Sequence, residues 1–148
     1  MASTSTPVVE GWLFVGGPGE PPALIGLSCT RCTTVVFPPT AIACPNPRCQ
    51  SPSLEPTRLS RSGRIWSYTD AQYQPPPPYV PSRDPYQPFA IAAVELEREK
   101  LIVLGQVAEG YSAAELSVGG EVELVVEPIE PRAAAPLVWR WRPTGAGR

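Results

Sequence analysis

Histidine is absent from the 148 residues, and Asp70 and Asp84 are the only aspartates. Catalytic triads and general bases that depend on an imidazole are therefore excluded within this chain. Charged residues make up only 18% of the sequence, the net charge is −2, and the pI is about 5.2. Because proteins that bind nucleic acids usually have a basic face and a pI above about 9, we expect no nucleic-acid partner.

Long hydrophobic runs are also lacking. Met1–Pro7 contains no basic residue, and the nearby apolar run, Trp12–Val15, is too short for a signal peptide or a membrane span. We therefore expect a cytoplasmic protein with no membrane partner. In a reducing compartment, clustered cysteines bind metal more often than they form disulfides.

Proline and glycine are abundant, with 21 and 12 residues, while 43% of the sequence is hydrophobic. This combination indicates folded modules joined by stiff loops. We divide the chain into four parts: an N-terminal arm (1–22), a cysteine module (23–56), a β-rich module (57–142) and a flexible tail (143–148). In the arm, Trp12 and Phe14 are expected either to pack on the chain's own core or to dock on another subunit.

The four cysteines form two pairs, Cys29-x2-Cys32 and Cys44-x4-Cys49. Tight turns between paired cysteines aim both sulfurs at one ion, and tetrahedral zinc accepts four thiolates at about 2.3 Å. Because Thr33–Phe37 between the pairs is predicted to be a strand, the module is predicted to be a rubredoxin-like zinc ribbon. Disulfide pairing and an iron centre are the alternatives. With every ligand supplied by protein, such a zinc site is closed and supports structure, not catalysis.

Four thiolates on one divalent cation carry a formal charge of −2. Arg31 and Arg48 lie within the two cysteine knuckles. We expect their guanidinium groups to offset this charge from outside the ligand shell.

The β-rich module shows the alternation of apolar and polar residues that is typical of strands. Five strands are predicted: Arg64–Gln72, Pro88–Glu97, Lys100–Val107, Glu121–Glu127 and Leu137–Arg142. A hairpin turn is predicted at Arg98-Glu99, and the capping-box pattern Ser112–Glu115 predicts one helical turn. Five strands with a short helical segment between the third and fourth are the plan of an OB-fold barrel; a generic five-stranded sheet is the alternative.

The order of several short segments resembles a known family, the zinc-ribbon plus OB-fold proteins catalogued as domain of unknown function number thirty-five. The segments are the four cysteines, Phe37-Pro38-Pro39, Leu59–Arg64, Trp66–Thr69, Pro88–Leu96 and Leu104–Val107. Two features depart from the family pattern: the four-residue gap between Cys44 and Cys49, and the stretch Pro131–Pro136.

Members of this family typically act as small partner subunits of thiolase-like enzymes, including sterol-carrier-type thiolases, acyl-CoA condensing enzymes and aldolases of steroid side-chain breakdown. The resemblance implies a mainly β chain that is not catalytic alone. It implies a hetero-oligomer with a thiolase-like or lipid-transfer-type subunit, a structural Zn²⁺ ion, and a CoA thioester as a shared ligand.

Cationic and aromatic residues gather where the two modules meet. Arg58, Arg61 and Arg64 lie within seven residues and are followed by Trp66 and Tyr68. Because arginine binds phosphates in a bidentate manner and stacks on rings, these residues are candidates for holding the nucleotide end of CoA. The alternative is that the arginines form ion pairs with the acidic second half of the chain.

The run Pro75–Pro78 favours a polyproline II rod, which loses little entropy on docking. It either bridges two strands or presents Tyr73, Tyr79 and Tyr86 to the partner. A different function is also consistent with an OB-fold. A stand-alone protein that binds single-stranded nucleic acid would use Trp66, Tyr68 and Tyr73 as stacking platforms.

Overall fold

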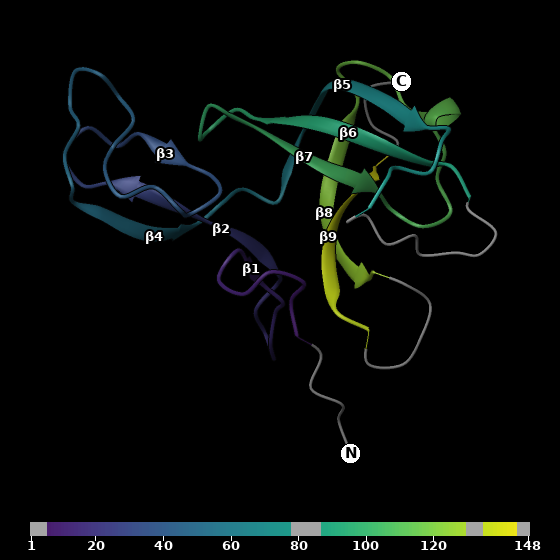
Figure 1. Cartoon of the computed structure of the whole chain (residues 1–148), viewed down its shortest axis with the longest axis horizontal. Coiled ribbons are helices and arrows are strands. Elements are labelled where there is room, and N and C mark those ends of the chain that lie inside the picture. Colours follow the sequence, from purple (N-terminus) through teal and green to yellow (C-terminus); the bar gives the residue numbers. More distant parts are fainter. Residues whose placement is uncertain (1–5, 78–86, 130–134, 145–148) are drawn as a thin grey trace.

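The computed structural model describes residues 6–77, 87–129 and 135–144, which form two β modules side by side (Figure 1). The N-terminal module is a four-stranded sheet of β1 (Leu13–Phe14), β2 (Ala23–Cys29), β3 (Val35–Val36) and β4 (Leu54–Arg58). The central strand β2 pairs with each of the others in antiparallel register. The strand predicted at Thr33–Phe37 is shorter than expected, because Thr33 belongs to a turn and has a φ of 67°.

The C-terminal module is a closed barrel with the strand order β5-β6-β7-β9-β8. Its strands are β5 (Ser62–Ala71), β6 (Phe89–Leu96), β7 (Leu101–Val107), β8 (Glu121–Pro128) and β9 (Leu137–Pro143). The closed barrel confirms the OB-fold prediction against the generic sheet, and each strand end lies within two residues of its predicted position.

The predicted helical turn between the third and fourth barrel strands is present as the 3₁₀ helix η1 (Ala113–Glu115), with a capping box between Ser112 and Glu115. The predicted hairpin is present as well, although the turn is longer than Arg98-Glu99. Lys100 closes it in the left-handed region, with a φ of 58° and a hydrogen bond from its N–H to the Leu96 carbonyl of 2.8 Å.

The barrel core follows from the alternation along its strands. The even-numbered residues of β6, from Ala90 to Leu96, are all buried, as are Val122 and Leu124 of β8. Trp141 of β9 is fully buried and pairs with both β7 and β8, so it lies where the barrel closes. Among the residues that the structure describes, there is no helix with the length and hydropathy of a membrane span.

The N-terminal arm packs on its own chain. The Val8 N–H donates to the Leu137 carbonyl at 2.7 Å, and the Leu137 N–H donates to Thr6 at 2.8 Å, so the arm extends the edge of β9. The Trp12 ring contacts Phe37 of the ribbon and Trp139 of the barrel, with centroid distances of 5.6 and 6.4 Å. These rings join the arm, the ribbon and the barrel into one apolar cluster.

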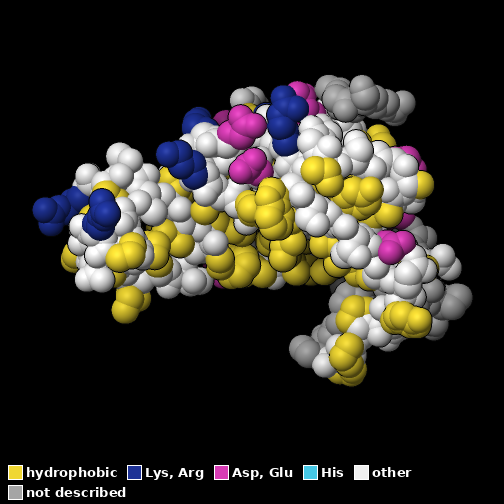
Figure 2. Space-filling model, turned by 90° about the horizontal axis from the view of Figure 1, so that it is seen from above, with side chains coloured by type: hydrophobic (Ala, Val, Ile, Leu, Met, Phe, Trp, Pro, Cys, Tyr) yellow, Lys and Arg dark blue, Asp and Glu magenta, His cyan; other side chains and the backbone are white. Residues whose placement is uncertain are grey.

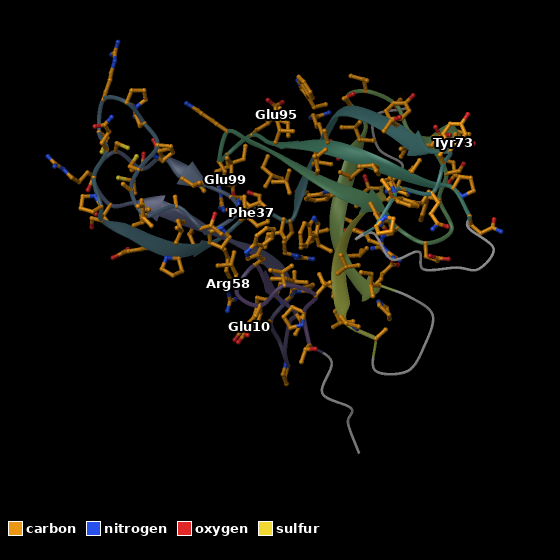
Figure 3. All side chains as sticks on the ribbon, viewed as in Figure 1. Glu10, Phe37, Arg58, Tyr73, Glu95 and Glu99 are labelled. Carbon is orange, nitrogen blue, oxygen red and sulfur yellow. The ribbon has the colours of Figure 1, made fainter. Side chains whose placement is uncertain are left out.

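Glu99 forms a polar link at the junction of the modules (Figure 3). Its side chain is only 4% exposed and accepts hydrogen bonds from the Ser60 N–H at 2.6 Å, the Ser60 hydroxyl at 2.9 Å and Arg98 at 3.1 Å. Burial raises the pKa of this carboxyl, but the bonds from Ser60 and Arg98 outweigh burial and hold the pKa below its usual value. Ser60 lies between β4 and β5, so the carboxylate fixes the connection between ribbon and barrel.

Glu99→Gln is expected to destabilise the protein at pH 7 by about 1–3 kcal/mol, because charge-assisted hydrogen bonds to a buried group are lost. A carboxyl with a depressed folded-state pKa stabilises above its unfolded pKa of about 4.3, and this stabilisation is lost as the pH falls through the lower folded-state pKa. The difference in unfolding free energy between wild type and variant should therefore shrink below about pH 4. Urea unfolding of wild type and Glu99→Gln from pH 7 to pH 3 measures this difference in unfolding free energy. A difference that stays constant over this pH range would contradict the prediction.

Candidate metal centre and junction surface

The two cysteine pairs converge on one point. The sulfur atoms of Cys29, Cys32, Cys44 and Cys49 all lie within 4.8 Å of one another. The distance is 3.7 Å between the sulfurs of Cys29 and Cys49 and 3.5 Å between those of Cys32 and Cys44. Four sulfurs placed tetrahedrally at about 2.3 Å from a zinc ion would be about 3.8 Å apart. The residues therefore fit a metal ion such as zinc.

The first knuckle begins at the end of β2. The Thr33 N–H donates to the Cys29 carbonyl at 3.0 Å, and the Cys29 N–H donates to Thr34 at 2.9 Å. The left-handed conformation of Thr33 reverses the chain directly after Cys32. This turn presents the sulfurs of Cys29 and Cys32 on the same side.

The second knuckle reaches a similar geometry over a longer gap. Asn46 supplies the turn, because its carbonyl accepts the N–H groups of Cys49 at 2.9 Å and Gln50 at 3.1 Å. Its side-chain oxygen accepts the Arg48 N–H at 3.0 Å. Gln50 follows Cys49 with a φ of 55°, as Thr33 follows Cys32. The four-residue gap therefore still brings both sulfurs to the site.

Hydrogen bonds and burial act differently on the four thiols. Backbone N–H groups of Cys32 and Arg31 lower the pKa of Cys29, and the Thr34 side chain and backbone lower the pKa of Cys32 to about 6. Burial raises the pKa of Cys44. At Cys49 the Ser51 backbone lowers the pKa, but burial and the neighbouring thiols outweigh it and raise the pKa to about 11. Because all four must be thiolates to bind zinc, metal binding displaces protons.

The sulfurs have polar neighbours that were not predicted. The Thr34 hydroxyl lies 3.1 Å from the Cys32 sulfur, and the Asn46 amide donates to that sulfur at 3.8 Å. The signal for these two neighbours is a hydroxyl or amide side chain two residues after a cysteine. Arg31 and Arg48 are exposed, and their role in offsetting the charge of the thiolates stays a prediction.

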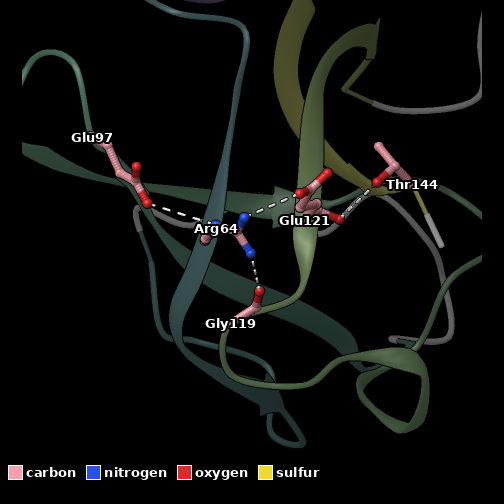
Figure 4. A network of polar contacts seen from close by, with 5 residues as sticks. All are labelled: Arg64, Glu97, Gly119, Glu121 and Thr144. Atoms are coloured by element: carbon pink, nitrogen blue, oxygen red, sulfur yellow. Dashed lines mark hydrogen bonds and ion pairs between the residues drawn. The ribbon is translucent and has the colours of Figure 1, made fainter. Parts of the chain in front are cut away.

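Two of the three junction arginines form ion pairs. Arg58 lies 2.9 Å from Glu20, and its guanidinium carbon is 4.1 Å from the centre of the Phe14 ring. Arg64 contacts Glu97 at 3.6 Å and Glu121 at 3.2 Å, and it donates to the Gly119 carbonyl at 3.2 Å (Figure 4). For Arg64, this is the pairing with the acidic second half that the alternative interpretation expected.

Arg61 is exposed and has no ion pair within residues 6–77, 87–129 and 135–144. It lies between two residues that line a cavity of about 370 Å³ at the start of the barrel. The lining residues are Ser60, Ser62, Gly63, Arg64, Glu97, Arg98 and Glu121. The cavity therefore offers hydroxyl and guanidinium donors, balanced by two carboxylates.

The predicted aromatic residues do not form one cluster. Trp66, Tyr68 and Tyr73 are exposed, whereas Trp12 and Phe14 take part in the contacts within the chain described above. Tyr79 and Tyr86 lie outside the described residues, as do Pro78 and most of Pro131–Pro136. The proposed roles of all these residues in docking or in acyl-CoA binding stay predictions.

Comparison with known proteins places these observations in a family. Residues 57–127 match the family described as "ChsH2, C-terminal OB-fold domain". A "DUF35 domain-containing scaffold protein" of Methanocaldococcus jannaschii is 30% identical over 123 residues, which is 83% of this chain and 79% of the relative. The chain belongs to the DUF35 family.

The solved structure "Ltp2-ChsH2(DUF35) aldolase" has the same fold as this DUF35 chain. Its TM-score is 0.62 at 24% identity, and the match covers 82% of this chain and 84% of the other. The comparisons confirm the resemblance drawn from the sequence. They also show that this DUF35 chain covers most of the length of both proteins, so the ribbon and the barrel are matched together.

Proposed function

We propose that this DUF35 protein is a non-catalytic accessory subunit that binds a thiolase-like partner and helps to hold an acyl-CoA. The proposed process is the degradation of steroids or of other compounds carried as acyl-CoA. The observation that carries the proposal is the convergence of all four cysteines on one closed site. The printed names of a relative and of a structural neighbour, a scaffold protein and an Ltp2-ChsH2(DUF35) aldolase, support it.

The chemistry of the substrate explains why a partner is needed. Forming or breaking a carbon–carbon bond in an acyl-CoA usually requires a nucleophile or base of the cysteine or histidine type. This chain has no histidine, and a Zn²⁺ ion bound to all four cysteines would occupy the only thiolates. The catalytic groups of the proposed complex therefore come from the partner.

The cavity at the junction is the proposed site for the phosphates of CoA. The Ser62 hydroxyl is a donor there, and Arg61 is the adjacent arginine without an ion pair in the described residues. Ser60 and Arg98 also line the cavity, but the Ser60 hydroxyl donates to Glu99 and Arg98 is paired with the same carboxylate. Arginine binds phosphate oxygens through two N–H groups at once. Arg64 would have to exchange its carboxylate partners for phosphate, so Arg61 is expected to contribute more.

Arg61→Ala is expected to raise the Kd of the complex for CoA about fivefold, since an exposed charge-assisted contact is worth about 1 kcal/mol. Assembly with the partner should not change. Arg48→Ala is the matched control, because Arg48 is also exposed but lies in the second knuckle. Isothermal titration with CoA measures both variants, and equal affinities would remove Arg61 from the proposed site.

The proposed function is tested by co-expression with the thiolase-like protein encoded nearest to this chain. Co-elution on gel filtration, and CoA binding that is tighter with both subunits present, are the expected results. Failure to co-elute would contradict the proposal. Binding of oligonucleotides with steep salt dependence would instead support the stand-alone nucleic-acid-binding alternative.

A further inference from the structure

The outer face of the barrel carries apolar side chains that the core does not use. Across β5, β6 and β7, Ala93 lies opposite Ser67 on one side and Leu104 on the other, and Glu95 lies opposite Ile102. Leu104 is 64% exposed, Ile102 46% and Trp66 59%. We call Trp66, Ile102 and Leu104 the β7 patch; Ala93, on the strand between them, is only 8% exposed. Figure 2 shows hydrophobic side chains gathered over the middle of the molecule, with charged side chains beside them.

A β-bulge lies at Trp66. Ile65 pairs with Val94, and both are buried in the barrel, but the next pair is Ser67 with Ala93. Trp66 is therefore the extra residue of β5. Alternation after the buried Ile65 already turns Trp66 outward, and the bulge brings Ser67 to the same outer face, where it pairs with Ala93. Ala93 lies on β6 between the strands that carry Trp66 and Leu104 and is buried, so the apolar surface offered to a partner comes from the two larger, exposed side chains.

A free carboxylate borders this patch. Glu95 is exposed (Figure 3) and lies opposite both Arg64 and Ile102. The Arg64 guanidinium is engaged by Glu97 and Glu121, and Glu95 has no ion pair with any described residue. The patch therefore combines an apolar centre with an unpaired negative charge at its edge. A complementary surface would present an apolar side chain beside a lysine or arginine.

We propose that the β7 patch is the docking surface for the thiolase-like partner, which packs an apolar side chain on Trp66 and Leu104 and places a basic residue against Glu95. This inference rests on the proposed function. A second copy of the chain is a poorer occupant. A two-fold contact centred on the patch would bring two Glu95 carboxylates together, and the neighbouring Arg64 is already paired.

The experiment measures the Kd of the metal-loaded chain for the co-expressed partner. Leu104→Glu is the main variant. Because Leu104 is not among the proposed CoA-binding residues, this variant tests docking of the partner separately from binding of CoA. It should weaken the partner Kd at least tenfold, as expected for a residue at the centre of an interface. Glu95→Arg should weaken it as well. Ile42→Glu is the matched control, because Ile42 is 92% exposed in the ribbon, and it should bind like wild type.

The outcomes separate the two proposals. If wild type and Leu104→Glu bind the partner equally, the docking surface is wrong and the accessory function stands. If wild type does not bind, both proposals fall. If Leu104→Glu instead abolishes a dimer of this chain seen by light scattering and leaves partner binding unchanged, the occupant is a second copy and the proposal is overturned. Equal metal content and equal Tm of all variants exclude misfolding as the cause.

Discussion

Cys44→Ser is expected to lose the metal and unfold the ribbon. The binding free energy of a structural zinc ion is about 10–16 kcal/mol, and it is at the same time folding free energy. The sheet of the ribbon is small, because β1 and β3 are two residues each and β2 and β4 pair over five positions. We expect metal content near zero by elemental analysis, and a Tm lowered by about 10 °C or more, since each kcal/mol shifts Tm by about 2–4 °C in a chain of this size.

Loss of the metal should also change the surroundings of the tryptophan rings that contact the ribbon. Phe37, directly after β3, packs against Trp12 and Trp139, with centroid distances of 5.6 and 5.9 Å. Disordering the ribbon removes this ring, so tryptophan fluorescence should change when the metal is lost. Chelation of the wild type should give the same change, and added zinc should reverse it in the wild type but not in Cys44→Ser.

Two results would contradict the metal centre. Full metal content and an unchanged Tm in Cys44→Ser would show that Cys44 is not a ligand. A mass lower by two or four hydrogen atoms in non-reducing mass spectrometry would instead support disulfides. A coloured protein would indicate iron in place of zinc. Cys29→Ser serves as a second variant from the other knuckle and should behave in the same way.

The barrel strands could be predicted because apolar and polar residues largely alternate along them, as in β8, where Val122 and Leu124 are the buried residues. The alternation of burial is not strict, because Ala92, Ala93 and Val94 are all buried in β6. β4 was missed because it contains Pro56, which removes a backbone donor. It is tolerated there because, among the described strands, β4 pairs only with β2 and is an edge strand. β2 was missed because Gly26 interrupts its apolar run. An added Cβ there would lie 2.7 Å from the Val36 carbonyl.

The candidate metal centre was predictable because the spacing within each cysteine pair is a local property. For Arg64 the acidic second half was expected to supply the partners, but the particular residues were not predictable, because Glu20 and Glu121 are far from Arg58 and Arg64 in the sequence and become neighbours only in the folded chain. The β7 patch was hidden for a similar reason. Alternation after Ile65 predicts that Trp66 is exposed, but which exposed side chains share its face depends on the pairing of β5, β6 and β7, which one strand does not reveal.

Trp141→Ala is expected to destabilise the barrel by about 3–5 kcal/mol, the range found when a buried large aromatic side chain is removed. Trp141 is fully buried and pairs with Val107 of β7 and Leu124 of β8. It also packs closely on β7, because a Cβ added to Gly105 would lie 2.8 Å from the Trp141 indole nitrogen. Removing the ring therefore opens a cavity where the barrel closes, next to the strand that carries Leu104.

Trp141→Phe should be much milder than Trp141→Ala. The indole N–H of Trp141 is buried without a hydrogen-bond partner in the described part of the chain, and phenylalanine removes this unsatisfied donor while keeping a ring. Trp66→Ala is the matched control, since the same change at an exposed position should alter the unfolding free energy by less than about 1 kcal/mol. Urea unfolding of the metal-loaded proteins, monitored by circular dichroism, ranks the unfolding free energies of the three variants. A Trp141→Ala variant within 1 kcal/mol of wild type would show that this ring does not hold the barrel closed.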